Sequence, residues 1–152
     1  MNPPETVTLV VRRNFPYSAE RVFDAWLNPV LAREFLFTTP ASEVVRCEID
    51  AHVGGRYTLV DRRPDGLEIT HVGSYLEIDR PHRLVFTLQV PQFSPEEDKV
   101  VLTLTPLASG CELVLTTMIA KSALDQFPLA EMEKGWTMIL SGLGDALASP
   151  QS

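Results

Sequence analysis

The histidines are the residues of this chain best suited to acid–base chemistry, because imidazole titrates near neutral pH. His82 follows a proline in a turn, and His52 precedes a pair of glycines, so both are expected at the periphery. His71 differs because it lies inside a strand pattern, LEITHVGSYLE, at residues 67–77. It is therefore the one histidine whose side chain could face an interior site.

The two-residue period of a strand determines which residues share a face with His71. Ile69, His71 and Tyr75 share one face, and the opposite face is also apolar, so alternation alone does not decide which face is buried. If the Ile69/Tyr75 face is concave, His71 can form a hydrogen bond to a ligand. The alternatives are a histidine bonded to a neighbouring strand, or one exposed on the convex face.

No other pattern predicts a catalytic or metal site. The carboxylates lie at strand ends or in one acidic loop, and a pair of glycines at Gly54-Gly55 is better explained as a sheet corner than as a phosphate-binding loop. Cys47 and Cys111 are far apart and belong to no Cys/His cluster, so reduced, buried thiols are expected. We therefore predict no catalytic residue, no metal site and no cofactor. A protein without catalytic activity is favoured, and an enzyme stays open as an alternative.

Composition and charge narrow the class of protein. The chain has 152 residues, of which 45% are hydrophobic and 22% charged, and its net charge is -7. This composition predicts one globular domain over residues 1–152, with an ordered core at about 6–148 and short flexible termini. The acidic balance argues against a nucleic-acid partner. Because no apolar run is long enough to span a bilayer, we expect no membrane segment and a cytoplasmic location.

The first part of the chain predicts a strand and two short helices. Residues 6–14, TVTLVVRRN, are rich in β-branched side chains. Ser18 then stands as a helix N-cap before AERVFDAWLN. Asn28-Pro29 ends that helix, and Pro29 is suited to open a second one, VLAREFL.

The middle of the chain has the periodicity of strands. Six candidate strands lie at residues 42–50, 55–63, 67–79, 82–90, 99–107 and 111–120. The connections between them are short, and Pro64-Asp65-Gly66 is a strong hairpin signal. Antiparallel neighbours are therefore predicted.

The C-terminal segment predicts one long helix that begins near Pro128. Its apolar residues form one stripe, namely Leu129, Met132, Trp136, Ile139, Leu140, Leu143 and Leu147. The predicted fold is α+β, with a strongly curved antiparallel sheet of about seven strands wrapped around this helix. The order of elements is strand, two helices, six strands and a helix.

Three glycines interrupt the C-terminal helix, at Gly135, Gly142 and Gly144. Each glycine in a helix interior costs roughly 0.5–1 kcal/mol relative to alanine. Gly135 and Gly142 lie along one edge of the apolar stripe, so something is expected to approach the helix closely there. A packed strand or short helix is the favoured explanation, and a ligand that needs the room is the alternative.

Four segments together resemble a known family: RVFDAWLNPVLAREF, HVGGRYTL followed by PDG, GSYLEIDRPHRLVFTL and EKGWTMILSGL. They are similar to the homologues of the activator of heat-shock-protein ATPase, which belong to the START-like, birch-pollen-allergen-like helix-grip superfamily (SRPBCC). The resemblance covers about residues 8–147. The chain has Phe35-Leu36 where the family usually has two tryptophans, and Leu88 where tryptophan is common. The resemblance therefore implies the fold, with a pocket or interface of different shape.

The resemblance also implies where a ligand would lie and what the protein would do. In this fold the space between sheet and C-terminal helix would be lined by Trp26, Phe35, Tyr57, Leu59, His71, Tyr75, Phe86, Leu88, Leu102, Met132, Trp136, Ile139, Leu140 and Leu143. The leading hypothesis is non-catalytic binding of a small hydrophobic or amphipathic ligand there. The alternatives are an interaction module that contacts a chaperone, another protein or a second copy of the chain, and an enzyme that uses His71 with a carboxylate or Tyr75.

Overall fold

The computed structural model describes residues 6–39, 41–93, 96–121, 124 and 128–148. The termini that the sequence predicts to be flexible lie largely outside these residues. The elements are β1 (Thr6–Phe15), α1 (Ala19–Ala25), α2 (Pro29–Phe35), β2 (Glu43–Ile49), β3 (Arg56–Arg62), β4 (Glu68–Asp79), β5 (Arg83–Leu88), β6 (Asp98–Leu107), β7 (Gly110–Ala120) and α3 (Leu129–Ala148).

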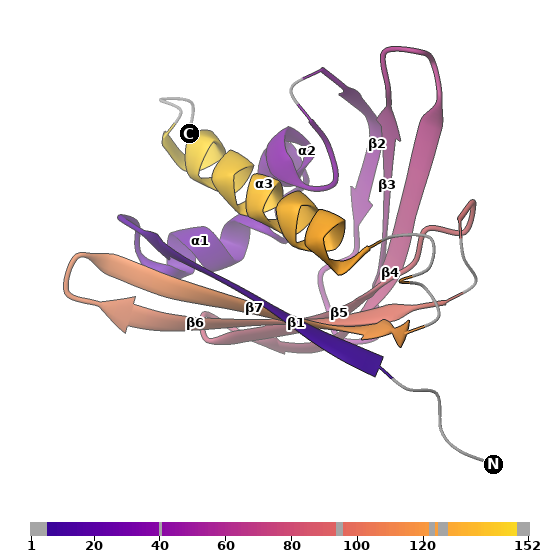
Figure 1. Ribbon diagram of the computed structural model, residues 1–152. Coiled ribbons are helices and arrows are strands. Elements are labelled where there is room, and N and C mark those ends of the chain that lie inside the picture. Colours follow the sequence, from indigo (N-terminus) through magenta and orange to yellow (C-terminus); the bar gives the residue numbers. More distant parts are fainter. Residues whose placement is uncertain (1–5, 40, 94–95, 122–123, 125–127, 149–152) are drawn as a thin grey trace.

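The predicted α+β fold is confirmed. The seven strands form one antiparallel sheet in the order β1-β7-β6-β5-β4-β3-β2, so the first strand joins the last and β2 ends the other edge. The sheet curves around α3, and α1 and α2 lie on the same side of the sheet as α3 (Figure 1). The concave face therefore meets all three helices.

The sheet bends at the middle of β4. The first half of this strand pairs with β3, and from Tyr75 onward it pairs with β5, with a register shift between Tyr75 and Glu77. Gly73 lies at the bend, where a Cβ atom would overlap the carbonyl oxygen of Thr87 and come within 2.6 Å of the Tyr57 ring. Only glycine allows the two backbones to approach this closely.

The predicted corner at Gly54-Gly55 is present and holds the same bend. Gly54 has a φ of 89°, in the left-handed region that favours glycine. Its amide donates to the carbonyl oxygen of Tyr75 at 2.9 Å, and the Tyr75 amide donates to the carbonyl oxygen of Gly55 at 3.0 Å. The corner thus fixes the backbone of Tyr75 from the edge of the sheet.

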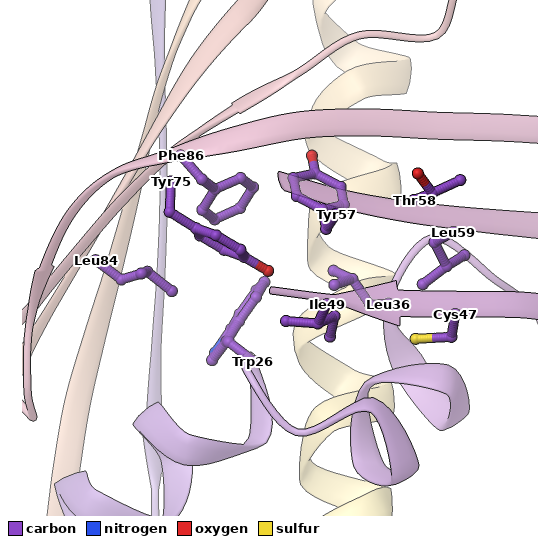
Figure 2. A pocket seen from close by; sticks show the side chains of 10 residues that line it. All are labelled: Trp26, Leu36, Cys47, Ile49, Tyr57, Thr58, Leu59, Tyr75, Leu84 and Phe86. Atoms are coloured by element: carbon purple, nitrogen blue, oxygen red, sulfur yellow. The ribbon is translucent and has the colours of Figure 1, made fainter. Parts of the chain in front are cut away.

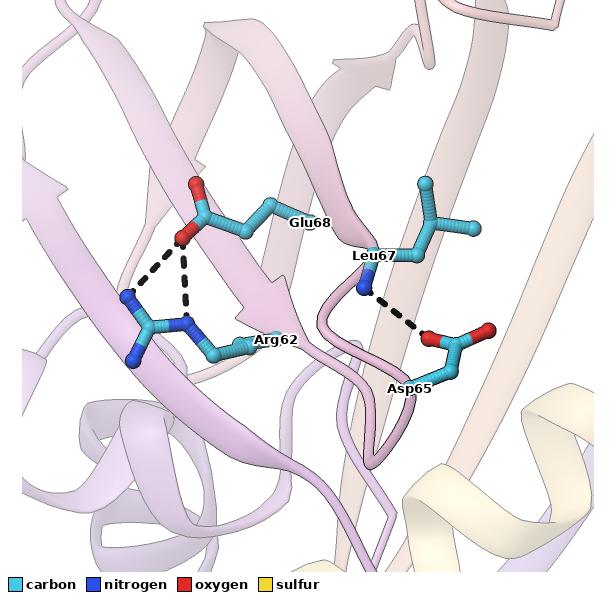
Figure 3. A network of polar contacts seen from close by, with 4 residues as sticks. All are labelled: Arg62, Asp65, Leu67 and Glu68. Carbon is cyan, nitrogen blue, oxygen red and sulfur yellow. Dashed lines mark hydrogen bonds and ion pairs between the residues drawn. The ribbon is translucent and has the colours of Figure 1, made fainter.

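The hairpin between β3 and β4 also forms as predicted. The carboxylate of Asp65 accepts a hydrogen bond from the Leu67 amide at 2.9 Å, and Gly66 has a φ of 90°. Arg62 and Glu68 form an ion pair across the strand ends at 2.9 Å (Figure 3). These contacts keep β3 and β4 in register and so place Tyr57 and Tyr75 on one face.

The two short helices begin at the predicted caps. The hydroxyl of Ser18 accepts a hydrogen bond from the Arg21 amide at 3.2 Å, and the Asn28 side chain accepts one from the Val30 amide at 2.9 Å. Pro29 is the first residue of α2. The break between these helices leaves Trp26, the C-cap of α1, directed into the core.

The glycines of α3 have different surroundings. A Cβ atom at Gly142 would lie 3.2 Å from the Cβ of Phe35 in α2, so a short helix does pack closely at this point. A Cβ at Gly135 would meet no described atom within 4 Å. The close approach predicted for the Gly135/Gly142 edge therefore holds at Gly142 only. None of the described helices is long and apolar enough to cross a membrane.

Candidate functional site

A small cavity lies between the sheet and the junction of α1 and α2. Its volume is about 10 Å³, and its walls come from both short helical segments and from β2 to β5. Figure 2 shows Trp26 projecting from the helical segment toward the strands that carry Tyr75 and Phe86. The lining residues are Trp26, Leu36, Cys47, Ile49, Tyr57, Thr58, Leu59, Tyr75, Leu84 and Phe86.

The size of this cavity limits what it can hold. A volume of about 10 Å³ is close to the minimum for a single water molecule, which is roughly 10–15 Å³. Sites for drug-sized ligands have volumes of about 300–1,000 Å³. A ligand larger than a few atoms would therefore have to displace side chains of the wall.

Only some of the residues that the sequence predicts to line a cavity do line this one. Trp26, Tyr57, Leu59, Tyr75 and Phe86 do line it. The other predicted residues lie outside the lining, namely Phe35, His71, Leu88, Leu102, Met132, Trp136, Ile139, Leu140 and Leu143. The physical reason is that side chains of the segments after α1 and α2 meet the aromatic strands in place of α3. Trp26 packs against Phe86, and Phe37 contacts both Tyr57 and Trp136 of α3.

Five lining residues were not among those predicted: Leu36, Cys47, Ile49, Thr58 and Leu84. For two of these residues, the sequence contains a signal that could have placed them in the lining. Cys47 pairs with Leu59 and Ile49 pairs with Tyr57 across β2 and β3, so the register of this pair places them on the same face. The contribution of Leu36 depends on how the chain leaves α2, which the sequence pattern does not specify.

Aromatic rings dominate the walls of the cavity. The rings of Tyr57 and Tyr75 are 5.7 Å apart between centroids, and those of Tyr57 and Phe86 are 5.9 Å apart and nearly perpendicular. Trp26 lies 6.3 Å from Phe86 and 5.3 Å from Phe35. These are the spacings of favourable aromatic pairs. The rings hold one another in place and leave the cavity at their junction.

Two polar groups of this cluster differ in their hydrogen bonding. The Tyr57 hydroxyl donates a hydrogen bond to the carbonyl oxygen of Thr87 at 2.6 Å. The indole nitrogen of Trp26, a residue only 2% exposed, is buried and has no hydrogen-bond partner among the described residues. Buried donors without a partner are uncommon in proteins, so this one requires an explanation.

The titratable groups of the lining are neutral at physiological pH. Burial raises the pKa of Tyr57 well above its usual value and raises the pKa of Tyr75 as well. Burial also raises the pKa of the Cys47 thiol. No Lys, Arg, Asp, Glu or His side chain is among the residues that line the cavity. The site therefore presents an apolar, uncharged environment.

His71 lies on the concave face, next to the cavity cluster and outside its lining. Its ring stacks on Phe37 at 4.6 Å, and Phe37 in turn meets Trp136 edge-to-face at 5.9 Å. The His71 Nδ1 atom is 3.4 Å from the carbonyl oxygen of Leu59. Burial lowers the pKa of His71 to about 4, so the ring is neutral near pH 7.

This arrangement does not favour acid–base chemistry at His71. No hydrogen bond in the described part of the chain joins its ring to a carboxylate or to Tyr75. The nearby carboxylate of Asp61 is buried and instead accepts a hydrogen bond from the Thr38 hydroxyl at 2.7 Å. Phe37, whose ring stacks on the His71 ring, has a backbone φ of 53°, which is uncommon for a bulky residue.

A larger hollow lies on the surface between α2 and α3. This groove has a volume of about 410 Å³ and is open to solvent. It is lined by Glu34, Phe35, Thr38, Thr39, Met138, Ser141, Gly142, Asp145 and Ala146. The closely packed Gly142 forms part of its floor, and Met138 is 47% exposed. Over the residues that the structure describes, no three His, Cys, Asp or Glu side chains group as a metal site would require.

Comparison with known proteins gives a consistent result. The model of the family described as activator of Hsp90 ATPase homolog 1-like protein matches residues 16–148. A search of curated proteins found no match. Solved structures of similar fold include a protein of Chromobacterium violaceum, 26% identical, with a TM-score of 0.83 over 95% of this chain and 98% of that chain.

Two further solved structures show the same fold at lower identity. A protein of Rhodobacter sphaeroides is 24% identical, with a TM-score of 0.84 and a match that covers 99% of each chain. An AHSA1-like protein of Aeromonas hydrophila is 18% identical, with a TM-score of 0.79 over 93% of this chain and 92% of that chain. These likenesses concern the fold and carry no ligand or reaction.

Proposed function

Because the chain belongs to the family of activator of Hsp90 ATPase homolog 1-like proteins, we propose that it is a non-catalytic binding protein. Its ligand is a small, uncharged, largely apolar molecule that enters the cavity at the junction of α1 and α2. The observation that carries this proposal is the cavity itself, which is lined by aromatic and aliphatic side chains and by no charged group.

The cavity has to open for such a ligand to enter. β3, β4 and β5 are each paired on both sides, whereas β2 is an edge strand paired only with β3. Cys47 and Ile49 on β2 are half-buried, in contrast to Leu59 and Phe86, which are fully buried. The β2 wall is therefore the part of the lining that moves most easily, and a ligand enlarges the site toward it.

Ligand screening with a pair of matched variants tests this proposal. Ile49→Phe fills the cavity from the β2 wall, and Ile139→Phe makes the same change at a half-buried residue of α3 outside the lining. Thermal-shift screening with small aromatic compounds, followed by calorimetry, is expected to find binders that weaken at least tenfold in Ile49→Phe and bind normally to Ile139→Phe. The proposal is wrong if no compound binds, or if both variants bind equally well.

An interaction module is the second candidate, and the groove between α2 and α3 supports it. The groove is already formed, and it combines exposed Met138 with the carboxylates of Glu34 and Asp145. The family description names an activator of the Hsp90 ATPase, which is a protein-binding role. A protein partner, or a second copy of this chain, would use this surface without entering the core.

A chaperone ATPase assay tests this second candidate. Met138→Lys changes the groove, and Val10→Lys changes an equally exposed residue on β1. If the groove binds the chaperone, the native chain stimulates ATP hydrolysis by an Hsp90 chaperone, and only Met138→Lys reduces that stimulation. Stimulation that is absent, or that both variants retain, rejects this use of the groove.

A further inference from the structure

The two edges of the sheet, β1 and β2, differ in how they are protected against pairing with another strand (Figure 1). β2 is interrupted by a register shift between Val44 and Arg46, and the Arg33 side chain donates a hydrogen bond to the carbonyl oxygen of Val44 at 3.1 Å. Bulges and charged side chains are common means of blocking an edge strand. β1 pairs with β7 over ten residues without a shift, and it contains no proline. β1 is therefore the unprotected edge.

The hydrogen-bond pattern determines which backbone groups of β1 point away from β7. The Leu104 amide donates to the carbonyl oxygen of His82 at 2.9 Å, which fixes the phase of the ladder between β5 and β6. Bonded residues alternate along antiparallel strands, and the registers of β6 with β7 and of β7 with β1 have no shift, so the odd-numbered residues of β1 bond to β7. The N–H and C=O groups that point away from β7 belong to Thr6, Thr8, Val10, Arg12 and Asn14.

These outward groups of β1 are open to a partner. α3 packs on the inward side of β1, where a Cβ atom at Gly144 would lie 3.7 Å from the Phe15 ring. Apart from the ladder to β7, no hydrogen bond between the described residues reaches the outward amide and carbonyl groups. The side chains of Arg12, Arg13 and Asn14 are exposed in succession, as expected of a strand that nothing covers along its outer edge.

We infer that β1 is an interface between two copies of this chain. The two β1 strands pair antiparallel about a two-fold axis at Val10, and two seven-stranded sheets join into one continuous sheet. No residue of the outward edge lines the cavity or the groove between α2 and α3. The inference therefore goes beyond the proposed function and does not depend on it.

The distribution of side chains along β1 fits a partner identical to itself. Val10 lies near the middle of the strand and is 42% exposed, so an axis there brings the exposed apolar residue against its own copy. Arg12 then lies opposite Thr8 of the partner subunit. Arg13 lies opposite Val7 of the partner subunit, so no two arginines face each other. An apolar centre with charged side chains toward the rim is the usual arrangement of such an interface.

Other positions of the axis give a poorer interface. With the axis at Val10, all outward groups of residues 6–14 find partners. An axis at Thr8 shortens the paired segment to residues 6–10. An axis at Arg12 shortens it to residues 9–15 and places two guanidinium groups directly opposite each other, which is unfavourable. Length and charge therefore select the register centred on Val10.

Sedimentation equilibrium of the full chain tests the interface with a matched pair of variants. The native chain is expected to dimerise at micromolar concentration. Val10→Pro removes an amide proton that bonds only to the partner, so the ladder to β7 stays complete and proline is tolerated at this edge position. The dissociation constant of the dimer is expected to rise at least tenfold in Val10→Pro. Val10→Thr keeps the amide and the branched shape, and it is expected to associate as the native chain does.

A second pair of variants tests the register, and it does so without a proline. Thr8→Glu places a carboxylate opposite Arg12 of the partner subunit, and the symmetry repeats this pair. The dimer is therefore expected to tighten by about three- to tenfold, and Thr8→Arg is expected to weaken it by a similar factor. Thr105→Glu and Thr105→Arg make the same changes of charge at an exposed residue of β6, away from the edge, and are expected to leave the dissociation constant unchanged.

Each contrary outcome overturns the inference. A native chain that stays monomeric up to about 100 µM shows that β1 does not pair with its copy. A dimer that persists in Val10→Pro meets through another surface. If Thr8→Glu and Thr8→Arg change the dissociation constant in the same direction, or no more than the Thr105 variants do, the register is wrong. Binding of an acidic extended peptide to a monomeric chain, lost in Val10→Pro, would assign this edge to a different protein.

Discussion

The two halves of the concave face are filled with different side chains. On β6 and β7 the inward residues are aliphatic, and Leu102, Leu113 and Leu115 are completely buried. On β3, β4 and β5 the inward residues include Tyr57, Tyr75 and Phe86, and here the cavity remains. Flexible aliphatic chains interdigitate to crystal-like density, whereas rigid rings that meet at their edges leave gaps at their junctions. The aromatic half is thus the part of the core in which unfilled space remains.

The largest expected effect comes from truncating one leucine in each half. Leu115 lies between β1 and β6, opposite Val11 and Leu102, whereas Leu36 already borders the cavity. Leu115→Ala is expected to lower the free energy of unfolding by about 4 kcal/mol, and Leu36→Ala by about 2 kcal/mol because its side chain has fewer neighbours to lose. Urea denaturation measures both. Equal losses would mean that the two halves are equally well packed.

A slightly smaller effect is expected at the bend that separates the halves. Gly73→Ala would place a methyl group against the Thr87 carbonyl and the Tyr57 ring, so we expect a loss of about 3 kcal/mol. Ser74→Ala changes the next residue without adding an atom at the bend and is expected to cost less than about 0.5 kcal/mol. Denaturation curves of the two variants make the comparison. A well-tolerated Gly73→Ala would show that the bend can move.

The sequence predicts the fold because turns and periodicity are local signals. The hairpin at Asp65-Gly66, the caps at Ser18 and Asn28, and the corner at Gly54 all act over a few residues, and each is present. Together with the alternation of six strands, they determine the order of the elements. The apolar stripe of the C-terminal helix, which needs a broad apolar cover, predicts the curvature of the sheet and the place of the long helix, and the resemblance to a known family implies the same fold.

The site is less predictable because it depends on which elements meet. α3 carries the strongest apolar stripe, yet it is Trp26 and Leu36, which follow the two short helices, that line the cavity beside the aromatic strands. The face of His71 was undecided because both faces of β4 carry apolar residues, and its stacking on Phe37 depends on the left-handed conformation of that residue. The unpaired N–H of Trp26 is likewise a property of packing in three dimensions.

A pH titration sharpens the comparison through His71, in the aromatic half. Burial lowers its pKa in the folded chain to about 4, below the value near 6.5 expected when unfolded. Between these values the unfolded chain binds the proton and the folded chain does not, so stability falls as pH falls from about 6.5 to 4. The full pKa difference corresponds to about 3 kcal/mol, and partial exposure of the ring reduces the expected loss to about 2 kcal/mol.

The control for this titration has to account for Asp98. Burial and the neighbouring Glu96 raise the pKa of Asp98 to about 6, so its contribution has the opposite sign and is lost as pH rises through 6. The measurement is therefore made in an Asp98→Asn background, with and without His71→Asn. The free energy of unfolding of the Asp98→Asn protein, minus that of the same protein with His71→Asn added, should decrease as pH falls through this window. A difference that stays constant would mean that His71 titrates normally.

The smallest expected effect concerns two glycines of α3, only one of which touches the aromatic half. A Cβ at Gly135 meets no described atom within 4 Å, so Gly135→Ala should raise the free energy of unfolding by about 0.5–1 kcal/mol, the gain in helix propensity. A Cβ at Gly142 lies 3.2 Å from Phe35, whose ring packs edge-to-face on Trp26. In Gly142→Ala, Phe35 has to shift, so we expect this variant to lose the gain in stability. Because Phe35 packs on Trp26, we also expect the Trp26 indole signal to move in an NMR spectrum. If Gly142→Ala is as stabilising as Gly135→Ala and leaves the Trp26 signal unchanged, the contact between α2 and α3 is loose. Packing at the groove would then be independent of the cavity.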